Sequence, residues 1–402
     1  MRQVVIFGAG CVGRGLIAPL FCDAGWSVTF LDTVPDLVGA LSQSRSYSLV
    51  TLSATGRTVR TVRPVEALAV DDPEALSRLL AADVVVSCVG VRNLPAVADR
   101  LALAVSQRLE QHRPPLDVLV AENLHDAAAV LRGLLAERLP GVPAAVLDNG
   151  VGLMDTSIGR MIPVPDPTRP REEATTIEVE PYALLPYDAA AGRGLPLGVP
   201  GLVSDPTVPF AFYNDRKLYI HNAGHYFAAC LGGFAGCSTI AEAITDPGIR
   251  YLVRGAMVES AVALSRTYGV ALPGVLDHVD DLLYRFGNVA LGDTVERVGR
   301  DPVRKFAAGD RVLGALGAAD AAGLPGDYLS LAVAAGAVRV MRDAGWSEPA
   351  VWAHLDAGLA PGVLDGGRRA LVGDQIHALA SGYDFATQVA LLGRRFEATV
   401  RV

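Results

Sequence analysis

The feature that most constrains the fold is the regular alternation of short apolar runs with helical patterns in the first half of the chain. Helices that cover both faces of a parallel sheet favour uninterrupted apolar strands of this kind. We expect strands at Val4–Phe7, Val28–Leu31, Asp83–Cys88, Val118–Ala121 and Ala144–Leu147, and helices at Leu16–Ala24, Pro73–Ala81, Asn93–Glu110 and Asp126–Arg138. The alternation predicts a doubly wound α/β domain.

The remainder of the chain follows other patterns. Ser48–Ser53 and Thr58–Val62 predict a β-hairpin around Gly56, inserted into the α/β domain. From Pro186 to Pro209 proline and glycine accumulate, which is typical of a connection between domains. Beyond this stretch, helical periodicity replaces the β-branched runs, as in Ala228–Leu231, Tyr251–Tyr268, Val275–Phe286 and Tyr328–Ala344. We therefore expect an α/β domain over residues 1–195 and a mostly α-helical domain over residues 207–402.

Composition narrows the class of protein. With 51% hydrophobic and 19% charged residues, the 402-residue chain can bury a large core. A net charge of −8 argues against binding to nucleic acid, although a local basic pocket for a small anion stays open. No apolar run approaches the ~18 residues of a membrane-spanning helix, and the start does not resemble a signal peptide. The five cysteines form no CxxC pair, so we expect a cytoplasmic protein without disulfides or a metal site.

A glycine-rich turn directly follows the first expected strand and opens a helix. Its sequence is Gly8-Ala9-Gly10-Cys11-Val12-Gly13. In a GxGxxG turn the first glycine permits a tight bend, the second lets the backbone approach a pyrophosphate, and the third allows close helix–strand packing. The free N–H groups of the helix N-terminus then bind the anion. We therefore assign Gly8, Gly10, Cys11, Val12 and Gly13 to dinucleotide binding and the domain to the Rossmann type.

The choice of dinucleotide depends on Asp32. This residue ends the second strand, at the ~20-residue offset expected for a carboxylate that binds ribose hydroxyls. No Arg or Lys follows within ten residues, so the site would repel a 2′-phosphate and NAD is favoured over NADP. A second loop, Val89-Gly90, would approach the nicotinamide ribose, although Gly90 fits a plain strand end equally well. The alternative for the whole pattern is a tight turn with a surface aspartate.

Residues able to move a proton follow the Pro- and Gly-rich stretch. At roughly 100° per residue, Lys217, Asn222 and His225 fall within about 140° of one helix face. A lysine facing an apolar cleft has a lowered pKa and serves as a base toward an alcohol, while Asn and His donate hydrogen bonds to its oxygen. The pattern alone equally describes a solvated lysine beside a core histidine. We expect His221 to be structural.

Taken in order, these motifs resemble the polyol-specific long-chain dehydrogenases. The family's Lys-x4-Asn-x2-His motif is matched by Lys217, Asn222 and His225. Its N-terminal stretch is similar to Phe7–Gly15, and its Glu-Asn pair after a strand is similar to Glu122-Asn123. The signature of its phosphate-polyol branch resembles Glu296–Lys305, and the resemblance runs from residue 4 to about residue 315.

The resemblance implies a Rossmann domain, a helical C-terminal domain with the active site between the two, and hydride transfer to NAD without a metal. Lys217 would be the general acid and base, Asn123 and Asn222 would cradle the reacting oxygen, and His225 would orient the substrate. The residues that it assigns to the substrate are Glu180, Arg300, Arg304 and Lys305.

The basic stretch has two interpretations. Arg297, Arg300, Arg304 and Lys305 place four cations within nine residues. One interpretation is a pocket for a substrate phosphate, clamped by arginine. The other is a solvated helix face, on which Glu296 and Asp301 offset the positive charge.

Departures from the family pattern keep other substrates open. They are Cys11 in place of Asn, Ala121 in place of Cys, Gly159 in place of Asp, Leu184–Pro186 in place of Trp, and Arg285–Asn288 without the following Pro. The first function is interconversion of a polyol phosphate and a ketose phosphate, and the second is oxidation of a free polyol or hexonate. A third is NAD binding without turnover, although such a protein would not need the Lys217, Asn222 and His225 set. The sequence leaves the oligomeric state open.

Overall fold

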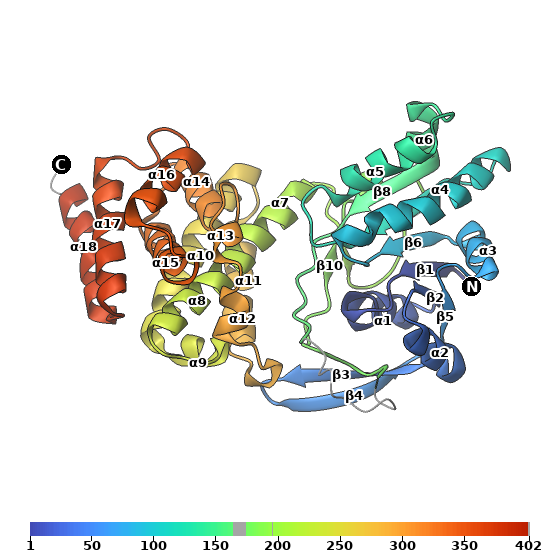
Figure 1. Ribbon diagram of the computed structural model, residues 1–402, viewed down its shortest axis with the longest axis horizontal. Helices are drawn as coiled ribbons and strands as arrows, with labels where there is room; N and C mark the ends of the chain where they lie inside the picture. The colour runs from blue at the N-terminus through green and yellow to red at the C-terminus, as the bar shows by residue number, and fades with distance from the viewer. Residues whose placement is uncertain (164–173, 195, 401–402) are drawn as a thin grey trace. The chain divides into compact units, whose positions relative to one another are not determined.

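The computed structural model describes residues 1–163, 174–194 and 196–400, with side chains up to residue 393. These residues form two compact units, Met1–Phe210 and Ala211–Val402. In Figure 1 the first unit runs from blue to green and the second from yellow-green to red. Within the described residues, no helix combines the length and the apolar character that crossing a membrane requires.

The first unit is built on a parallel sheet of six described strands. Their order is β5-β2-β1-β6-β7-β8, and every pairing is parallel. The strands are β1 (Gln3–Phe7), β2 (Ser27–Asp32), β5 (Val65–Ala69), β6 (Val84–Ser87), β7 (Leu116–Val120) and β8 (Val151–Asp155). The order reverses between β1 and β6, where ligands of such sheets bind beyond the carboxyl ends of the strands. The predicted doubly wound Rossmann sheet is therefore confirmed.

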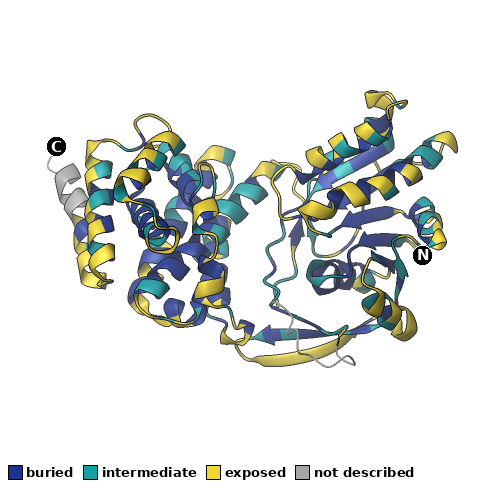
Figure 2. Ribbon diagram, viewed as in Figure 1, coloured by how far each residue is buried: buried dark blue, intermediate teal, exposed yellow. Residues whose placement is uncertain are grey.

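Helices cover both faces of this sheet because alternate strand residues point to opposite sides. Val4 and Ile6 of β1 join one buried cluster with α1 and α2. Val5 and Phe7 join another with α3, α4 and α5, and Figure 2 shows the strands between them as buried. The helices are α1 (Ala18–Asp23), α2 (Pro35–Ser44), α3 (Pro73–Ala81), α4 (Leu94–Glu110), α5 (Ala127–Arg138) and α6 (Ala144–Gly150).

One expected strand is wrong. Ala144–Leu147 lies in α6, and the sixth strand is β8, which begins at Val151. A four-residue apolar run does not distinguish a strand from a helical turn. Here only Leu147 of the run is buried while Val146 is 44% exposed, so the run contributes one face to the core as a helix does.

The expected hairpin is confirmed, and it recruits a third strand. β3 (Tyr47–Ser53) and β4 (Gly56–Val62) pair antiparallel, with Ser53 opposite Gly56, and β9 (Ile177–Val179) adds to β3 in parallel. The Pro- and Gly-rich stretch packs on the first unit. In it β10 (Leu185–Pro186) pairs with β11 (Leu202–Val203), and Leu197 and Val199 are buried in the same cluster as β1.

The second unit is helical, as predicted. Its two long helices, α10 and α15, pack against each other; α10 also contacts α8, α11 and α14, and α15 contacts α17. The four expected helical stretches lie in α8, α10, α11 and α15. The helices are α7 (Phe210–Asp215), α8 (Ala223–Phe234), α9 (Ile240–Thr245), α10 (Pro247–Tyr268), α11 (Leu272–Phe286), α12 (Val295–Gly299), α13 (Pro302–Lys305), α14 (Leu313–Ala321), α15 (Asp327–Ala344), α16 (Glu348–Gly358), α17 (Gly366–Ser381) and α18 (Phe385–Val400).

Candidate functional site

The glycine loop has the backbone that a dinucleotide needs. Gly8 adopts φ +97°, and its N–H donates to the Leu31 carbonyl at 2.9 Å. A Cβ on Gly8 would lie 2.7 Å from the carbonyl oxygen of Cys88, and a Cβ on Gly13 would lie 2.1 Å from that of Gly8. Neither position therefore accepts a side chain. A Cβ on Gly10 would meet no atom within 4 Å, so this part of the loop is open to a ligand.

Asp32 is oriented by the same loop. One carboxylate oxygen accepts the Ala9 N–H at 2.6 Å and the other accepts the Val34 N–H at 2.9 Å. A carboxylate has about four acceptor positions, so others remain for ribose hydroxyls. Asp32 lines a hollow of about 250 Å³ at the carboxyl ends of β1, β2 and β6, together with Phe7, Gly8, Gly10, Leu31, Thr33, Val70, Cys88, Val89, Asn93, Ala96 and Val97. The residues present thus fit the adenosine half of a dinucleotide.

Cys11 and Val12 pack against the cluster beneath the loop. Burial raises the pKa of the Cys11 thiol despite the opposing charge of Arg14, so this side chain is neutral. The helix then opens with a π-helical turn, Gly13–Ile17. The buried Arg14 guanidinium donates from Nε to the Ala9 carbonyl at 2.5 Å and from Nη1 to that of Thr175. Arg14 therefore stabilises the loop through hydrogen bonds. The sequence motif did not predict this role.

The loop after β6 is held by Glu122, which the sequence identified only as the first residue of a Glu-Asn pair. The buried carboxylate accepts the Ser87 hydroxyl at 2.7 Å, the Val89 N–H at 2.9 Å and the Gly90 N–H at 2.8 Å. Gly90 has φ +86°, so glycine is required here for the bend itself. Asn123 follows at the exposed end of β7 in the first unit, and its contribution to the reacting oxygen stays a prediction.

Lys217 and Asn222 lie on a π-helical segment, Arg216–Asn222. In a π-helix the backbone hydrogen bonds join residues five apart, so Lys217 and Asn222 stand one turn from each other. An α-helix would have rotated them about 140° apart. The chain continues as α8, where His225 follows Asn222 at the three-residue spacing of one helix face. All three side chains are half-buried. The widened turn therefore brings the motif closer together than α-helical periodicity predicts.

The environment of Lys217 suits proton transfer. Burial, and then the nearby charge of Arg311, lower the pKa of Lys217 from 10.5 to about 8. Arg311 itself is 14% exposed, and its Nε lies 2.8 Å from Asp310 Oδ1. Arg311 was missed in the sequence because it stands 94 positions from the lysine and outside the basic stretch. A lysine of this kind exchanges its proton near neutral pH.

His225 has two partners that the sequence did not reveal. Its Nε2 lies 2.9 Å from Asp293 Oδ2, and its ring stacks on Phe286 with the centroids 4.7 Å apart. His221, in contrast, is buried, and burial together with Arg285 lowers its pKa well below the ordinary value. His221 is therefore a neutral core residue in this unit.

The basic stretch does not converge on one point. Arg297 pairs with Asp293, Nε to Oδ1 at 2.9 Å. Lys305 is buried, and its ammonium donates to the Val298 carbonyl at 2.6 Å. Arg300 is exposed, and Arg304 lies 3.8 Å from Asp310 with its side chain 60% exposed. Arg304 thus shares a carboxylate with Arg311, the neighbour of Lys217.

Glu180 lies in the first unit and is fully buried. Its carboxylate accepts the Met161 N–H, and its carbonyl accepts Arg160 Nε at 3.0 Å. Its assignment to the substrate stays a prediction.

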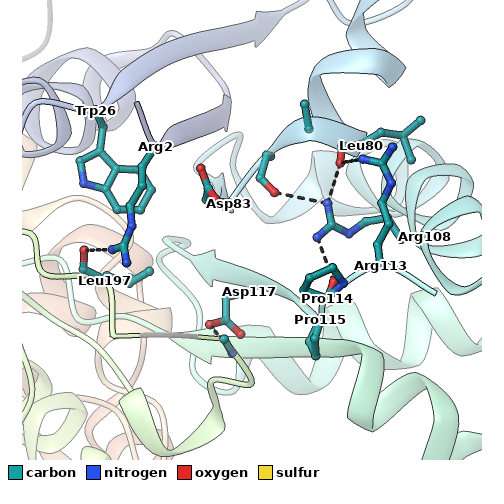
Figure 3. Close-up of a pocket in the computed structure, with 13 residues that line it drawn as sticks. Arg2, Trp26, Leu80, Asp83, Arg108, Arg113, Pro114, Pro115, Asp117 and Leu197 are labelled. Atoms are coloured by element: carbon teal, nitrogen blue, oxygen red, sulfur yellow. Dashed lines mark hydrogen bonds between the residues drawn. The ribbon is translucent and has the colours of Figure 1, made fainter. Parts of the chain in front are cut away.

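A second hollow, of about 370 Å³, lies at the opposite edge of the sheet, at the amino ends of β1, β6 and β7 (Figure 3). Arg108 and Arg113 both donate to the Leu80 carbonyl at 2.7 Å, and Arg108 also donates to that of Pro114 at 2.9 Å. These guanidiniums satisfy carbonyls at the end of α3, so they serve the fold. Across the described ranges, no group of three His, Cys, Asp or Glu side chains is arranged to hold a metal ion.

A Rossmann sheet with an open glycine loop, joined to a helical unit that carries a lysine of lowered pKa, defines a dinucleotide-dependent dehydrogenase acting on alcohols. The chain belongs to the mannitol dehydrogenase family. Residues 2–191 match the mannitol dehydrogenase Rossmann domain, and residues 210–343 match the mannitol dehydrogenase C-terminal domain. The resemblance to polyol dehydrogenases seen in the sequence is confirmed.

Two solved structures share this architecture over most of their length. Mannitol 2-dehydrogenase of Pseudomonas fluorescens, in a ternary complex with NAD and D-mannitol, is 18% identical, with 98% of this chain and 94% of that chain covered and a TM-score of 0.66. A D-sorbitol dehydrogenase in substrate-free form is 16% identical, with 94% and 92% covered and a TM-score of 0.72. At these identities the likeness is one of fold.

Proposed function

We propose that this protein is an NAD-dependent polyol dehydrogenase that needs no metal, with Lys217 as its general acid and base. The observation that supports the proposal most is the half-buried Lys217 on a π-helical turn, with its pKa lowered to about 8. Roughly a tenth of such lysines are neutral at pH 7. That fraction can take the hydroxyl proton of an alcohol.

NAD is the cofactor, and when bound it supplies the two-electron oxidation of the alcohol carbon. The loop from Gly8 to Gly13 binds its pyrophosphate, Asp32 its adenine ribose, and Val89–Gly90 its nicotinamide ribose. The chain's own part in the chemistry is the proton. Neutral Lys217 accepts it as the alcohol becomes a ketone, and the Lys217 ammonium returns it in the reverse direction. Asn123 and Asn222 donate hydrogen bonds to the reacting oxygen.

For the substrate we propose a polyol phosphate, with mannitol 1-phosphate oxidised to fructose 6-phosphate as in mannitol-1-phosphate 5-dehydrogenase. In support, Arg304 and Arg311 share Asp310, and two guanidiniums on one carboxylate leave positive charge for an anion. The charge of Arg311 also acts on Lys217. We also assign Arg300 and Lys305, from the same basic stretch, to the substrate phosphate.

A free polyol or hexonate is the second candidate. It is favoured by the exposure of Arg300 and Arg304 and by the engagement of the Lys305 ammonium with a carbonyl. The complex of the Pseudomonas fluorescens enzyme contains D-mannitol, an unphosphorylated polyol.

The deciding experiment follows NADH absorbance with the purified protein on fructose 6-phosphate, fructose and hexuronates. A phosphate site requires a much lower KM for fructose 6-phosphate than for fructose. Arg304→Gln should then cost about 10- to 150-fold in kcat/KM for the phosphorylated sugar and little for the free one, since a charge-assisted contact contributes ~1.5–3 kcal/mol. Arg250→Gln, an exposed arginine on α10, is the matched control. Equal use of both sugars would instead support the free polyol.

We propose a cytoplasmic location as well. In support, all five cysteines are free thiols, as is usual in a reducing compartment. Fractionation of cells with an antibody to the protein tests this assignment.

A further inference from the structure

A carboxylate outside the sequence motif lies against the imidazole of His225. It belongs to Asp293, in the loop that leads into α12. We infer that Asp293 is a positioning residue, which holds the proton of His225 on Nε2 and leaves Nδ1 as a hydrogen-bond acceptor for a substrate hydroxyl. This inference rests on the proposed function, because it specifies what His225 does in the same site.

The contact is close and largely shielded from water. Asp293 Oδ2 lies 2.9 Å from His225 Nε2, and the two side chains are 11% and 14% exposed. The ring is fixed from its flat side by Phe286, which stacks on it with an interplanar angle of 12°. The Nε2–H bond does not point straight at the carboxylate, so the contact is an electrostatic one and not an aligned hydrogen bond. The stacked Phe286 ring fixes the plane of the imidazole.

The charge of Asp293 decides which nitrogen carries the proton. Burial acts to raise the pKa of Asp293, but the His225 imidazole and the Arg297 guanidinium outweigh it, so that the pKa lies below the ordinary value. An ionised carboxylate only accepts hydrogen bonds. A ring lone pair 2.9 Å from that negative charge would be repelled, so the charge favours the tautomer with the proton on Nε2. In neutral imidazole the other nitrogen, Nδ1, then has a free lone pair.

The backbone holds the carboxylate in place independently of His225. The Asp293 carbonyl accepts the Ile240 N–H at 2.9 Å, and the next turn is tied by Val295 N–H to the Ser238 carbonyl at 3.0 Å. The Thr294 side chain caps α12 by accepting the Arg297 N–H. Asp293 is thus preorganised before a substrate arrives.

A polyol substrate gives this tautomer a function. Each carbon beside the reacting one carries a hydroxyl, which can donate a hydrogen bond to an unprotonated nitrogen. A ring with its proton on Nδ1 would instead present a second donor to that hydroxyl. Fixing the tautomer therefore selects the orientation in which substrate hydroxyls donate to the enzyme.

The direct test is ¹⁵N NMR of the wild-type protein with labelled histidine, at a pH where the ring is neutral and with His225→Gln to assign the signal. We expect the ¹⁵N signals of the two ring nitrogens to be those of an imidazole protonated at Nε2. Protonation at Nδ1 would overturn the inference. This measurement needs no substrate, so it still decides the inference if the protein turns over no polyol and the proposed function fails.

The kinetic test is Asp293→Asn, whose amide can present a donor to Nε2 and so reverse the tautomer. Loss of a carboxylate that orients a histidine costs about 10–100-fold at metal sites, and we expect a similar loss of kcat with NADH affinity unchanged. Asp280→Asn, which removes an exposed ion pair with Arg254 on α10, is the matched control and should keep full kcat. In a His225→Ala background, Asp293→Asn should have no further effect.

Two kinetic results would overturn the inference. One is an equal loss of kcat in Arg297→Gln, which would mean that the Asp293–Arg297 ion pair matters and the tautomer does not. The other is a full additional loss from Asp293→Asn in the His225→Ala background. If Asp293→Asn does not fold, the NMR result on the wild-type protein stands as the test.

Discussion

The Glu122 carboxylate accepts the Gly90 N–H at 2.8 Å, which joins the end of β7 to the loop after β6. The same carboxyl group accepts the Val89 N–H and the Ser87 hydroxyl, so three donors share one buried acceptor group. These loops flank the point where the strand order reverses, the place where a dinucleotide binds in such sheets. Glu122 thus shapes the cofactor site without itself having to touch the cofactor.

Replacing Glu122 by Gln should weaken NADH binding. The amide of Gln would point an N–H₂ group at one of the three donors, leaving a buried donor without an acceptor at a cost of about 1–3 kcal/mol. We expect a lower melting temperature and roughly a 10-fold higher Kd for NADH, measured by calorimetry and by fluorescence titration. Glu137→Gln, on the exposed side of α5, is the control. Unchanged NADH affinity in Glu122→Gln would show that the loop does not depend on this carboxylate.

Asp32 should set the preference for NAD over NADP. Its oxygens are held by Ala9 and Val34, and its negative charge faces the hollow in which the 2′-phosphate of NADP would lie. Replacing Asp32 by Ser together with Thr33→Arg removes that charge and adds a cation. The ratio of kcat/KM for the two cofactors should narrow or invert in the double variant. Equal rates of the native enzyme with both cofactors would contradict the role of Asp32.

Lys217 should govern the pH dependence of turnover. Oxidation of the alcohol requires the neutral amine, so kcat/KM should rise with pH through about 8, and reduction of the ketone should fall over the same range. Lys217→Ala should lower kcat by ~10²–10⁴-fold, abolish this titration and leave NADH binding nearly intact. Arg311→Gln should move the titration to higher pH, because one of the charges that lowers the pKa of Lys217 is gone. Chelators should have no effect, and inactivation by EDTA would refute the mechanism.

The sequence predicted those parts of the molecule that depend on local spacing. Three such parts are the turn from Gly8 to Gly13, the end of β2 at Asp32 and the hairpin around Gly56. Each is determined by residues only a few positions away along the chain. The run Ala144–Leu147 was misassigned because four apolar residues carry no periodicity, and the burial that separates α6 from β8 arises only in the folded unit.

The supporting residues of the candidate site could not be found in this way. Asp293 contacts His225 although the two residues are 68 positions apart in the sequence, and Arg311 lowers the pKa of Lys217 although it is 94 positions away. Neither contact therefore leaves a local sequence pattern. The π-helical turn was missed for a different reason. Helical periodicity was counted at roughly 100° per residue, which describes an α-helix and not the wider turn that aligns Lys217 with Asn222.

Burial disfavours the charged form of Lys217, so this lysine should lower the free energy of unfolding of the protein. The pKa of Lys217 is about 8 in the folded chain against 10.5 in its ordinary state, so between these values the unfolded chain binds more protons and stability rises with pH. Below pH 8 the full cost is present, and above pH 10.5 it is gone. Lys217→Met, which keeps the length of the side chain without the amine, should therefore unfold at a higher denaturant concentration than the native protein at pH 7. The difference in the free energy of unfolding, measured by urea titration, should shrink as the pH rises past 10. A variant less stable than the native protein at pH 7 would show that the fold stabilises the Lys217 ammonium, and the assignment of a lowered pKa would be wrong.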